Sequence, residues 1–211
     1  MKLALFALLS ALAACVLATN VAAALPPLTE DQRHRLAARD VIVLDTLPPA
    51  AGKSAQGGTA LAIVRASPED VWRVLTDYRG HPRFYPRVTA VDVLQADERH
   101  ALIRYQVGIG PFSFVFYMDK YPDPQRRRIE WKLAEGRANS LFRENTGYWQ
   151  IEEANGATVV TYAIAVRTLV PGFLTMGSER DSLAGTVTAM RNVVEKGTPT
   201  PAADRSGKPA N

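Results

Sequence analysis

Alternating apolar and polar residues fill most of the chain between residues 40 and 167 and predict a series of β-strands. Short segments rich in Gly, Pro, Asp and Asn separate the later strands, as at residues 108–111 and 122–124. Such short connections join neighbouring strands antiparallel, so we expect an antiparallel meander. The predicted strands cover residues 40–47, 59–64, 88–95, 100–108, 112–121, 127–133, 145–152 and 158–167.

Three segments show helical spacing instead. Residues 28–39 favour a short helix capped by Thr29, and Ser67 followed by Pro68 is a strong start for a second helix. The longest helix is expected over residues 172–196, where residues recur in steps of three and four along one face. That face is apolar except for its one arginine, and it consists of Phe173, Met176, Arg180, Leu183, Val187, Met190 and Val194.

The first 24 residues have the layout of a signal peptide. Lys2 is followed by an apolar run to Leu17 and then by small residues that end at Ala24. We therefore predict export to the periplasm with cleavage near Ala24. The segment around Cys15 resembles a lipoprotein signal, so a lipid-anchored form is the alternative. The predicted organisation is a signal peptide (1–24), an N-terminal extension (25–58), one main domain (59–196) and a disordered, proline-containing tail (197–211).

Charge and composition exclude several function classes. With 25 basic and 21 acidic residues the net charge is +4, which is too mild for a nucleic-acid-binding protein. The densest basic run, residues 126–128, follows a turn and is interpreted as a solvated hairpin edge; weak contact with an anionic membrane surface is the alternative. His34, His81 and His100 lie in separate segments without metal-ligand spacing, and no phosphate-binding loop is present. We therefore expect neither a metal nor a cofactor.

Several stretches resemble a known family. Residues 66–78, ASPEDVWRVLTDY, and 82–88, PRFYPRV, are similar to the start of polyketide cyclases and coenzyme-Q-binding proteins of the START-like (SRPBCC) superfamily. Residues 147–149 and 158–162 are similar to the late strands of those proteins. The resemblance covers residues 59–196 and implies an α+β helix-grip fold, in which a curved antiparallel sheet wraps around a long C-terminal helix. It does not choose among lipid and isoprenoid carriers, quinone-binding proteins, hormone receptors and cyclases.

Strand alternation assigns one face of the predicted sheet to the interior, for example Phe112, Phe114, Phe116 and Met118. A sheet that wraps a single helix leaves volume between them, and cavities lined by aromatic residues are typical of small-molecule sites. We therefore predict a cavity for a hydrophobic ligand of the lipid, isoprenoid or quinone class. Arg180 either extends its charged end into water or pairs with a polar end of the ligand. The candidate ligand-binding residues are Phe84, Tyr105, Phe114, Phe116, Trp131, Trp149, Tyr162, Phe173 and Arg180.

The potential catalytic groups in the sequence favour a binding protein over an enzyme. A cyclase-like enzyme acting on a polyketide-like substrate needs a general acid or base in its pocket. Among the candidates only Tyr162 is expected on the inner face, so we assign no catalytic residue. The enzyme and a non-catalytic interaction scaffold stay as alternatives, and neither the ligand nor the oligomeric state follows from the sequence. The acid–base candidates are Glu130, Glu144, Arg104, Arg143 and Tyr162.

Overall fold

An eight-stranded antiparallel sheet forms the frame of the molecule. The computed structural model describes residues 26–154, 156–169 and 179–197. The strands pair in the order β1-β2-β8-β7-β6-β5-β4-β3. They are β1 (Ile42–Leu44), β2 (Gln56–Val64), β3 (Val88–Ala96), β4 (Ala101–Ile109), β5 (Phe112–Asp123), β6 (Arg128–Leu133), β7 (Phe142–Ala154) and β8 (Ala157–Thr168). The helical segments are α1 (Glu30–Ala37), α2 (Pro68–Thr76), the 3-10 helix η1 (Tyr78–Arg83) and α3 (Glu179–Gly197).

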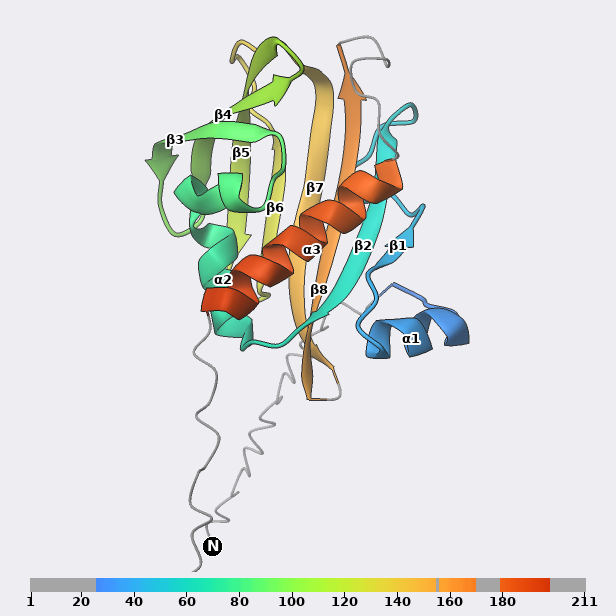
Figure 1. Cartoon of the computed structure of the whole chain (residues 1–211). Helices are drawn as coiled ribbons and strands as arrows, with labels where there is room; N and C mark the ends of the chain where they lie inside the picture. The colour runs from blue at the N-terminus through green and yellow to red at the C-terminus, as the bar shows by residue number, and fades with distance from the viewer. Residues whose placement is uncertain (1–25, 155, 170–178, 198–211) are drawn as a thin grey trace, which may run out of the picture.

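Helix α3 crosses one face of the sheet, which curves around it (Figure 1). Four residues of its predicted apolar stripe are buried: Leu183, Val187, Met190 and Val194. They pack in one core cluster with inward-facing strand residues such as Ile103. The α+β helix-grip fold expected from the sequence is confirmed. The predicted start of this helix, with Phe173 and Met176, lies outside the described residues.

Two strands begin three residues earlier than the sequence indicated. The predicted loop over residues 48–58 ends before Gln56, where β2 starts, and β7 starts at Phe142. Gly57 explains the first difference, because it has φ +147° and pairs with β8 so closely that a Cβ would lie 2.0 Å from the Ile164 carbonyl oxygen. Glycine is therefore required there for close strand pairing, although its presence favoured a loop in the sequence.

Helix α2 and η1 close one end of the grip and lead the chain toward the cavity. Ser67 caps α2 by accepting a hydrogen bond from the backbone N–H of Asp70, and Val71 and Leu75 are buried against the core. Segment η1 ends at Arg83 and is followed by Phe84, which is 1% exposed. This ordered turn fixes the position of the residues between η1 and β3.

The N-terminal extension is part of the same sheet. Strand β1 pairs antiparallel with β2, and α1, capped by Thr29 as predicted, packs beside it. Leu36, Ile42 and Leu61 form a second buried cluster on this side. Glu195 of α3 also accepts a hydrogen bond from the Arg39 guanidinium, which ties the extension to the helix inside the grip.

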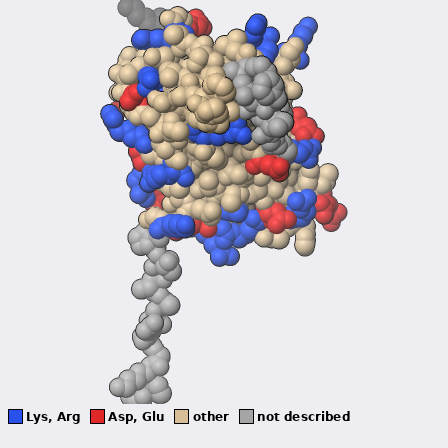
Figure 2. Space-filling view, turned by 45° about the horizontal axis from the view of Figure 1, so that its top comes forward, with Lys and Arg blue, Asp and Glu red and all other residues tan. Residues whose placement is uncertain are grey.

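The predicted basic run is balanced by carboxylates. Basic and acidic side chains are interspersed on the face shown in Figure 2. Each of the three arginines lies within ion-pair distance of a carboxylate, which reduces the positive field available for an anionic membrane surface. The pairs are Arg126 with Asp123, Arg127 with Glu69 and Glu153, and Arg128 with Glu130.

The predicted leader with Cys15 and residues 198–211 of the predicted tail lie outside the described residues, whereas Gly197 is the last residue of α3. Within residues 26–154, 156–169 and 179–197, no helix is long and apolar enough to cross a bilayer.

If the extension is part of one cooperative unit, Ile42→Ala should lower the free energy of unfolding of the whole domain. Ile42 is 2% exposed, and removing such a side chain leaves a cavity that costs about 2–5 kcal/mol. Denaturant unfolding followed by tryptophan fluorescence measures the change. Leu94→Ala is the control, since Leu94 is 49% exposed and its loss should stay within about 0.5 kcal/mol. An unchanged main transition in Ile42→Ala would show that the extension unfolds separately.

Candidate functional site

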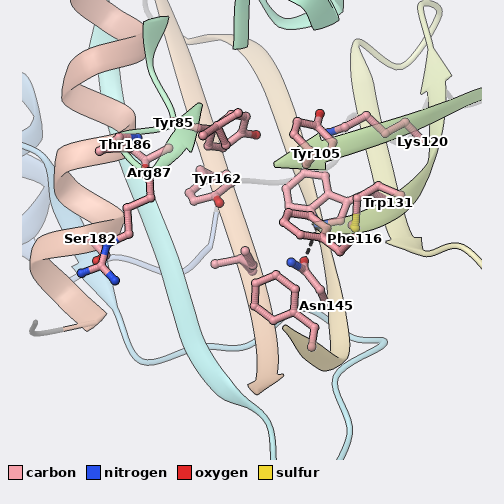
Figure 3. Close-up of a pocket in the computed structure, with 15 residues that line it drawn as sticks. Tyr85, Arg87, Tyr105, Phe116, Lys120, Trp131, Asn145, Tyr162, Ser182 and Thr186 are labelled. Atoms are coloured by element: carbon pink, nitrogen blue, oxygen red, sulfur yellow. Dashed lines mark hydrogen bonds between the residues drawn. The ribbon is translucent and has the colours of Figure 1, made fainter. Parts of the chain in front are cut away.

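A cavity of about 240 Å³ lies between α3 and the sheet. Strands β4 to β8 form its floor, α3 contributes one wall, and the segment between η1 and β3 contributes another (Figure 3). Most of the surrounding side chains are apolar or aromatic. The cavity is lined by Tyr85, Pro86, Arg87, Val88, Tyr105, Phe116, Met118, Lys120, Trp131, Phe142, Asn145, Tyr162, Ile164, Ser182 and Thr186.

Stacked aromatic rings make up much of the floor. The rings of Trp131 and Tyr162 are 5.8 Å apart and nearly parallel, and Tyr162 in turn stacks on Trp149 at 4.3 Å. Trp131 lies flat over β7 because Gly147 stands at the paired position, where a Cβ would be 2.4 Å from the indole ring. A glycine on β7 thus creates the space in which the Trp131 ring borders the cavity.

Lys120 brings a basic group into this aromatic environment. It is 3% exposed and projects from β5 toward Tyr105 and Trp131 (Figure 3). Its Nζ lies 4.7 Å from the ring centroid of Trp131, 5.8 Å from that of Tyr105 and 5.9 Å from that of Tyr78. These are cation–π distances. Burial lowers the pKa of Lys120 from 10.5 to about 7, so near neutral pH the group is present in both protonation states.

A buried histidine fixes the hydroxyl group of Tyr105. His81 is 1% exposed, and burial holds its pKa well below the ordinary value, so its ring is neutral. Its Nε2 lies 3.0 Å from the Leu75 carbonyl oxygen, which can only accept, and therefore carries the proton. Nδ1 then accepts a hydrogen bond of 2.7 Å from the Tyr105 hydroxyl. This pair holds the Tyr105 ring in place beside Lys120.

Two further polar groups orient the aromatic floor. The Asn145 side-chain oxygen accepts a hydrogen bond of 3.1 Å from Trp131 Nε1 (Figure 3). The Tyr85 hydroxyl accepts one of 2.9 Å from Trp149 Nε1. Both indole N–H groups are therefore satisfied, as buried tryptophans require, and neither needs a ligand as partner.

The structure brings four of the predicted ligand-binding residues together around the cavity: Tyr105, Phe116, Trp131 and Tyr162. Trp149 and Phe84 are core residues behind the lining, 2% and 1% exposed. Trp149 is covered by the ring of Tyr162.

The remaining candidates are placed elsewhere. Phe114 is partly buried near the β4–β5 hairpin and does not line the cavity. Arg180 also lies outside the lining: its side chain is 61% exposed and forms an ion pair with Asp45, so its charged end is in water. Phe173 lies outside the described residues.

Of the acid–base candidates, only Tyr162 lines the cavity. Arg104 and Glu130 pair on the outer side of the sheet with Asp92 and Arg128, because alternation turns them away from α3. The other two also stay outside the lining: Arg143 is exposed, and Glu144 accepts a hydrogen bond from the backbone N–H of Gly52. Within the described residues no three His, Cys, Asp or Glu side chains gather as a metal site would require.

Sequence reasoning missed Lys120, Asn145 and Tyr85. The inward alternation of β5 continues past Met118 to Lys120, and the alternation that places Trp149 inward does the same for Asn145. The sequence analysis did not assign Lys120 and Asn145 to the inner face, because polar residues are expected on the outer face. Tyr85 lies between η1 and β3, where no periodicity indicates direction.

The comparison with family models assigns the chain. The model described as polyketide cyclase / dehydrase and lipid transport matches residues 64–191, which is more than half of the sequence and includes every residue that lines the cavity. The chain belongs to this family. The resemblance to polyketide cyclases that residues 66–78 and 82–88 carry is thereby confirmed.

Several solved structures share the fold of this chain. A START superfamily protein from Mycobacterium smegmatis has a TM-score of 0.54 at 20% identity, over 66% of this chain and 97% of its own. A STAR-related lipid transfer protein from Xanthomonas axonopodis has a TM-score of 0.54 at 16% identity, over 73% and 92%. The Zhui aromatase/cyclase of a Streptomyces species has 0.52 at 19%, over 65% and 92%. No curated protein sequence matches the chain.

The low pKa of Lys120 implies that its effect on the free energy of unfolding depends on pH. Between pH 7 and 10.5 the unfolded chain binds a proton at this lysine that the folded protein does not. The buried lysine therefore lowers the free energy of unfolding, and this destabilisation is largest below pH 7. It decreases as the pH rises and is lost at about pH 10.5. Lys120→Met should therefore be more stable than the parent by roughly 2–4 kcal/mol near pH 7, with the cation–π contacts offsetting part of the gain. The difference should shrink toward pH 10.

Urea unfolding of both proteins across this range gives the difference directly and cancels the titration of all other groups. Lys132→Met is the matched control, because Lys132 is half exposed and its replacement should change the free energy of unfolding by about 0.5 kcal/mol or less. Parallel stability curves for the parent and Lys120→Met would show that Lys120 keeps an ordinary pKa.

Proposed function

We propose that the chain is an exported binding protein that holds a hydrophobic small molecule in the cavity between α3 and the sheet. The observation that carries this proposal is the cavity itself, whose lining is largely apolar and aromatic with a few convergent polar groups, as in small-molecule sites generally. The family description includes lipid transport, and the similar Xanthomonas axonopodis protein is described as a lipid transfer protein. Both agree with a carrier of the lipid, isoprenoid or quinone class.

The cavity volume limits which part of a ligand is enclosed. About 240 Å³ is slightly below the usual ligand pocket of roughly 300–1,000 Å³. One or two fused rings, such as a quinone head, or a short end of an isoprenoid or acyl chain matches this space. A complete lipid requires additional volume.

Export to the periplasm is part of the proposal and rests on the leader. The apolar run after Lys2 and the small residues before Leu25 match the layout of a cleaved signal peptide. A periplasmic carrier of this kind would shield an apolar molecule from water between membranes or between enzymes.

A cyclase-like reaction is the second candidate function. Tyr105, Tyr162 and Lys120 all line the cavity and carry groups that can exchange protons. The pKa of Lys120, about 7, suits proton exchange at neutral pH. Turnover of a polyketide-like substrate that depends on Tyr162 or Lys120 would favour this function over a carrier.

The carrier proposal predicts that a two-ring quinone quenches the emission of Trp131. Titration with 2-methyl-1,4-naphthoquinone should lower tryptophan fluorescence saturably, because a quinone in the cavity contacts the Trp131 ring. Trp131→Phe should lose most of this quenching. Trp72→Phe is the control, since Trp72 lies on α2 away from the cavity lining, and it should keep the saturable component. Linear, unsaturable quenching that is equal in all three proteins would contradict a quinone in this cavity.

A further inference from the structure

Among the residues that the structure describes, Lys120 is a buried cation without a counter-ion. Lysine is almost never fully buried unless it is paired, because removing a charge from water is costly. Lys120 is 3% exposed, and burial is the one cause of its lowered pKa. Its three neighbours at Nζ are aromatic rings, which attract a cation but do not neutralise it. The described surroundings of the Lys120 ammonium group therefore lack a negative charge to balance it.

The groups that face Lys120 from neighbouring elements do not supply that charge. Tyr78 from η1 and Tyr105 from β4 are held neutral, because burial raises the pKa of each hydroxyl, that of Tyr78 to about 12. His81 is neutral as well. The carboxylate next in sequence, Asp119, faces the other side of the sheet and binds His100. Among the described residues no carboxylate reaches Lys120.

The charged end of Lys120 borders the same cavity as the aromatic floor. Lys120 pairs with Trp131 across β5 and β6, so its ammonium group and the Trp131 ring form one continuous surface. Tyr105, held by His81, completes this surface from β4. A ligand whose rings lie on Trp131 and Tyr162 therefore presents one end to Lys120 (Figure 3).

We propose that the cavity selects a hydrophobic ligand with a single carboxylate group, which pairs with the Lys120 ammonium while the apolar body lies against Trp131, Tyr162 and Phe116. This inference rests on the proposed function, because it names the ligand class of the same cavity. It turns a site suited to hydrophobic molecules in general into one for a small acidic amphiphile, such as an aromatic or short-chain carboxylic acid.

A monoanion fits this site better than a dianion. One ammonium group balances one negative charge, and a phosphate monoester would bring a second charge into a wall of neutral rings. Arg87 also lines the cavity, but its labelled side chain lies with Ser182 and Thr186 on the α3 side, away from Lys120 (Figure 3), and it has an interaction of its own. The two cations are thus at different ends of the cavity and can be tested separately.

The lowered pKa of Lys120 is consistent with ligand-supplied charge. In the empty protein the amine is easily deprotonated, which limits the cost of burying it. A bound carboxylate favours the charged form and draws a proton onto the amine. Binding an acid then satisfies two groups that are each costly when buried alone.

The test compares 2-naphthoic acid with its uncharged analogue 2-naphthalenemethanol by calorimetry at pH 7. The parent protein should bind the acid about tenfold or more tightly than the alcohol, as expected for one charge-assisted hydrogen bond. Lys120→Met should lose this preference and keep the affinity for the alcohol within about threefold. Lys132→Met, which removes an exposed lysine of the next strand, should behave as the parent does.

Each other outcome has a distinct meaning. Binding of neither probe by the parent would count against the proposed function itself. Equal binding of both probes by the parent, or an acid preference that survives in Lys120→Met, would overturn the role of Lys120 and leave hydrophobic binding intact. An acid preference lost in Arg87→Met and kept in Lys120→Met would move the acidic end to the α3 side and also overturn it. Lys120→Gln, checked with Lys120→Met by circular dichroism, provides a second folded variant.

Discussion

The packing of one helix against a much wider curved sheet is the constraint on which the rest of the structure depends. The stripe of α3 from Leu183 to Val194 fills only part of the concave face, with Val187 and Met190 fully buried against the strands. The sheet beyond that stripe must be covered by side chains from its own inner face and by the segment after η1. Large rings do most of this, and a cavity of about 240 Å³ remains between them and α3. The proposed ligand site is thus a consequence of the fold.

Within that cavity, two principles of protein stability oppose each other. Apolar rings stabilise the core, whereas Lys120 in their midst lowers the stability of the empty protein, since an apolar residue of the same length would avoid the desolvation cost. His81 and Tyr105 show how a buried polar group is normally accommodated, with each ring nitrogen and the hydroxyl in a hydrogen bond. No described residue gives the Lys120 ammonium group a hydrogen bond of this kind. Residues that reduce stability without a structural benefit are expected at functional sites, and this is the physical reason to assign Lys120 to the ligand.

The fold follows from the sequence to a large extent, and the site only in part. Strand alternation and turn composition predict the meander, and Ser67-Pro68 predicts the start of α2, because these signals are local. Alternation also places Tyr105, Trp131 and Tyr162 on the inner face. It cannot show depth: Trp149 shares that face but is covered by Tyr162, and Arg180 shares the helical stripe but reaches water beside Asp45. Lys120 was not predicted as a site residue, because a charged residue is expected on the outer face. Its position in the alternation nevertheless indicates the inner face.

The protonation state of Lys120 is the most direct test of its proposed role in binding. In protein labelled with ¹³C and ¹⁵N at lysine, the Cε and Nζ signals that disappear in Lys120→Met belong to this residue, and their shifts can be followed against pH. Lys120 should titrate near pH 7 in the free protein, and its pKa should rise when 2-naphthoic acid saturates the cavity but not when 2-naphthalenemethanol does. Titration near the ordinary lysine value of 10.5, unchanged by the acid, would contradict both the buried cation and its role in binding.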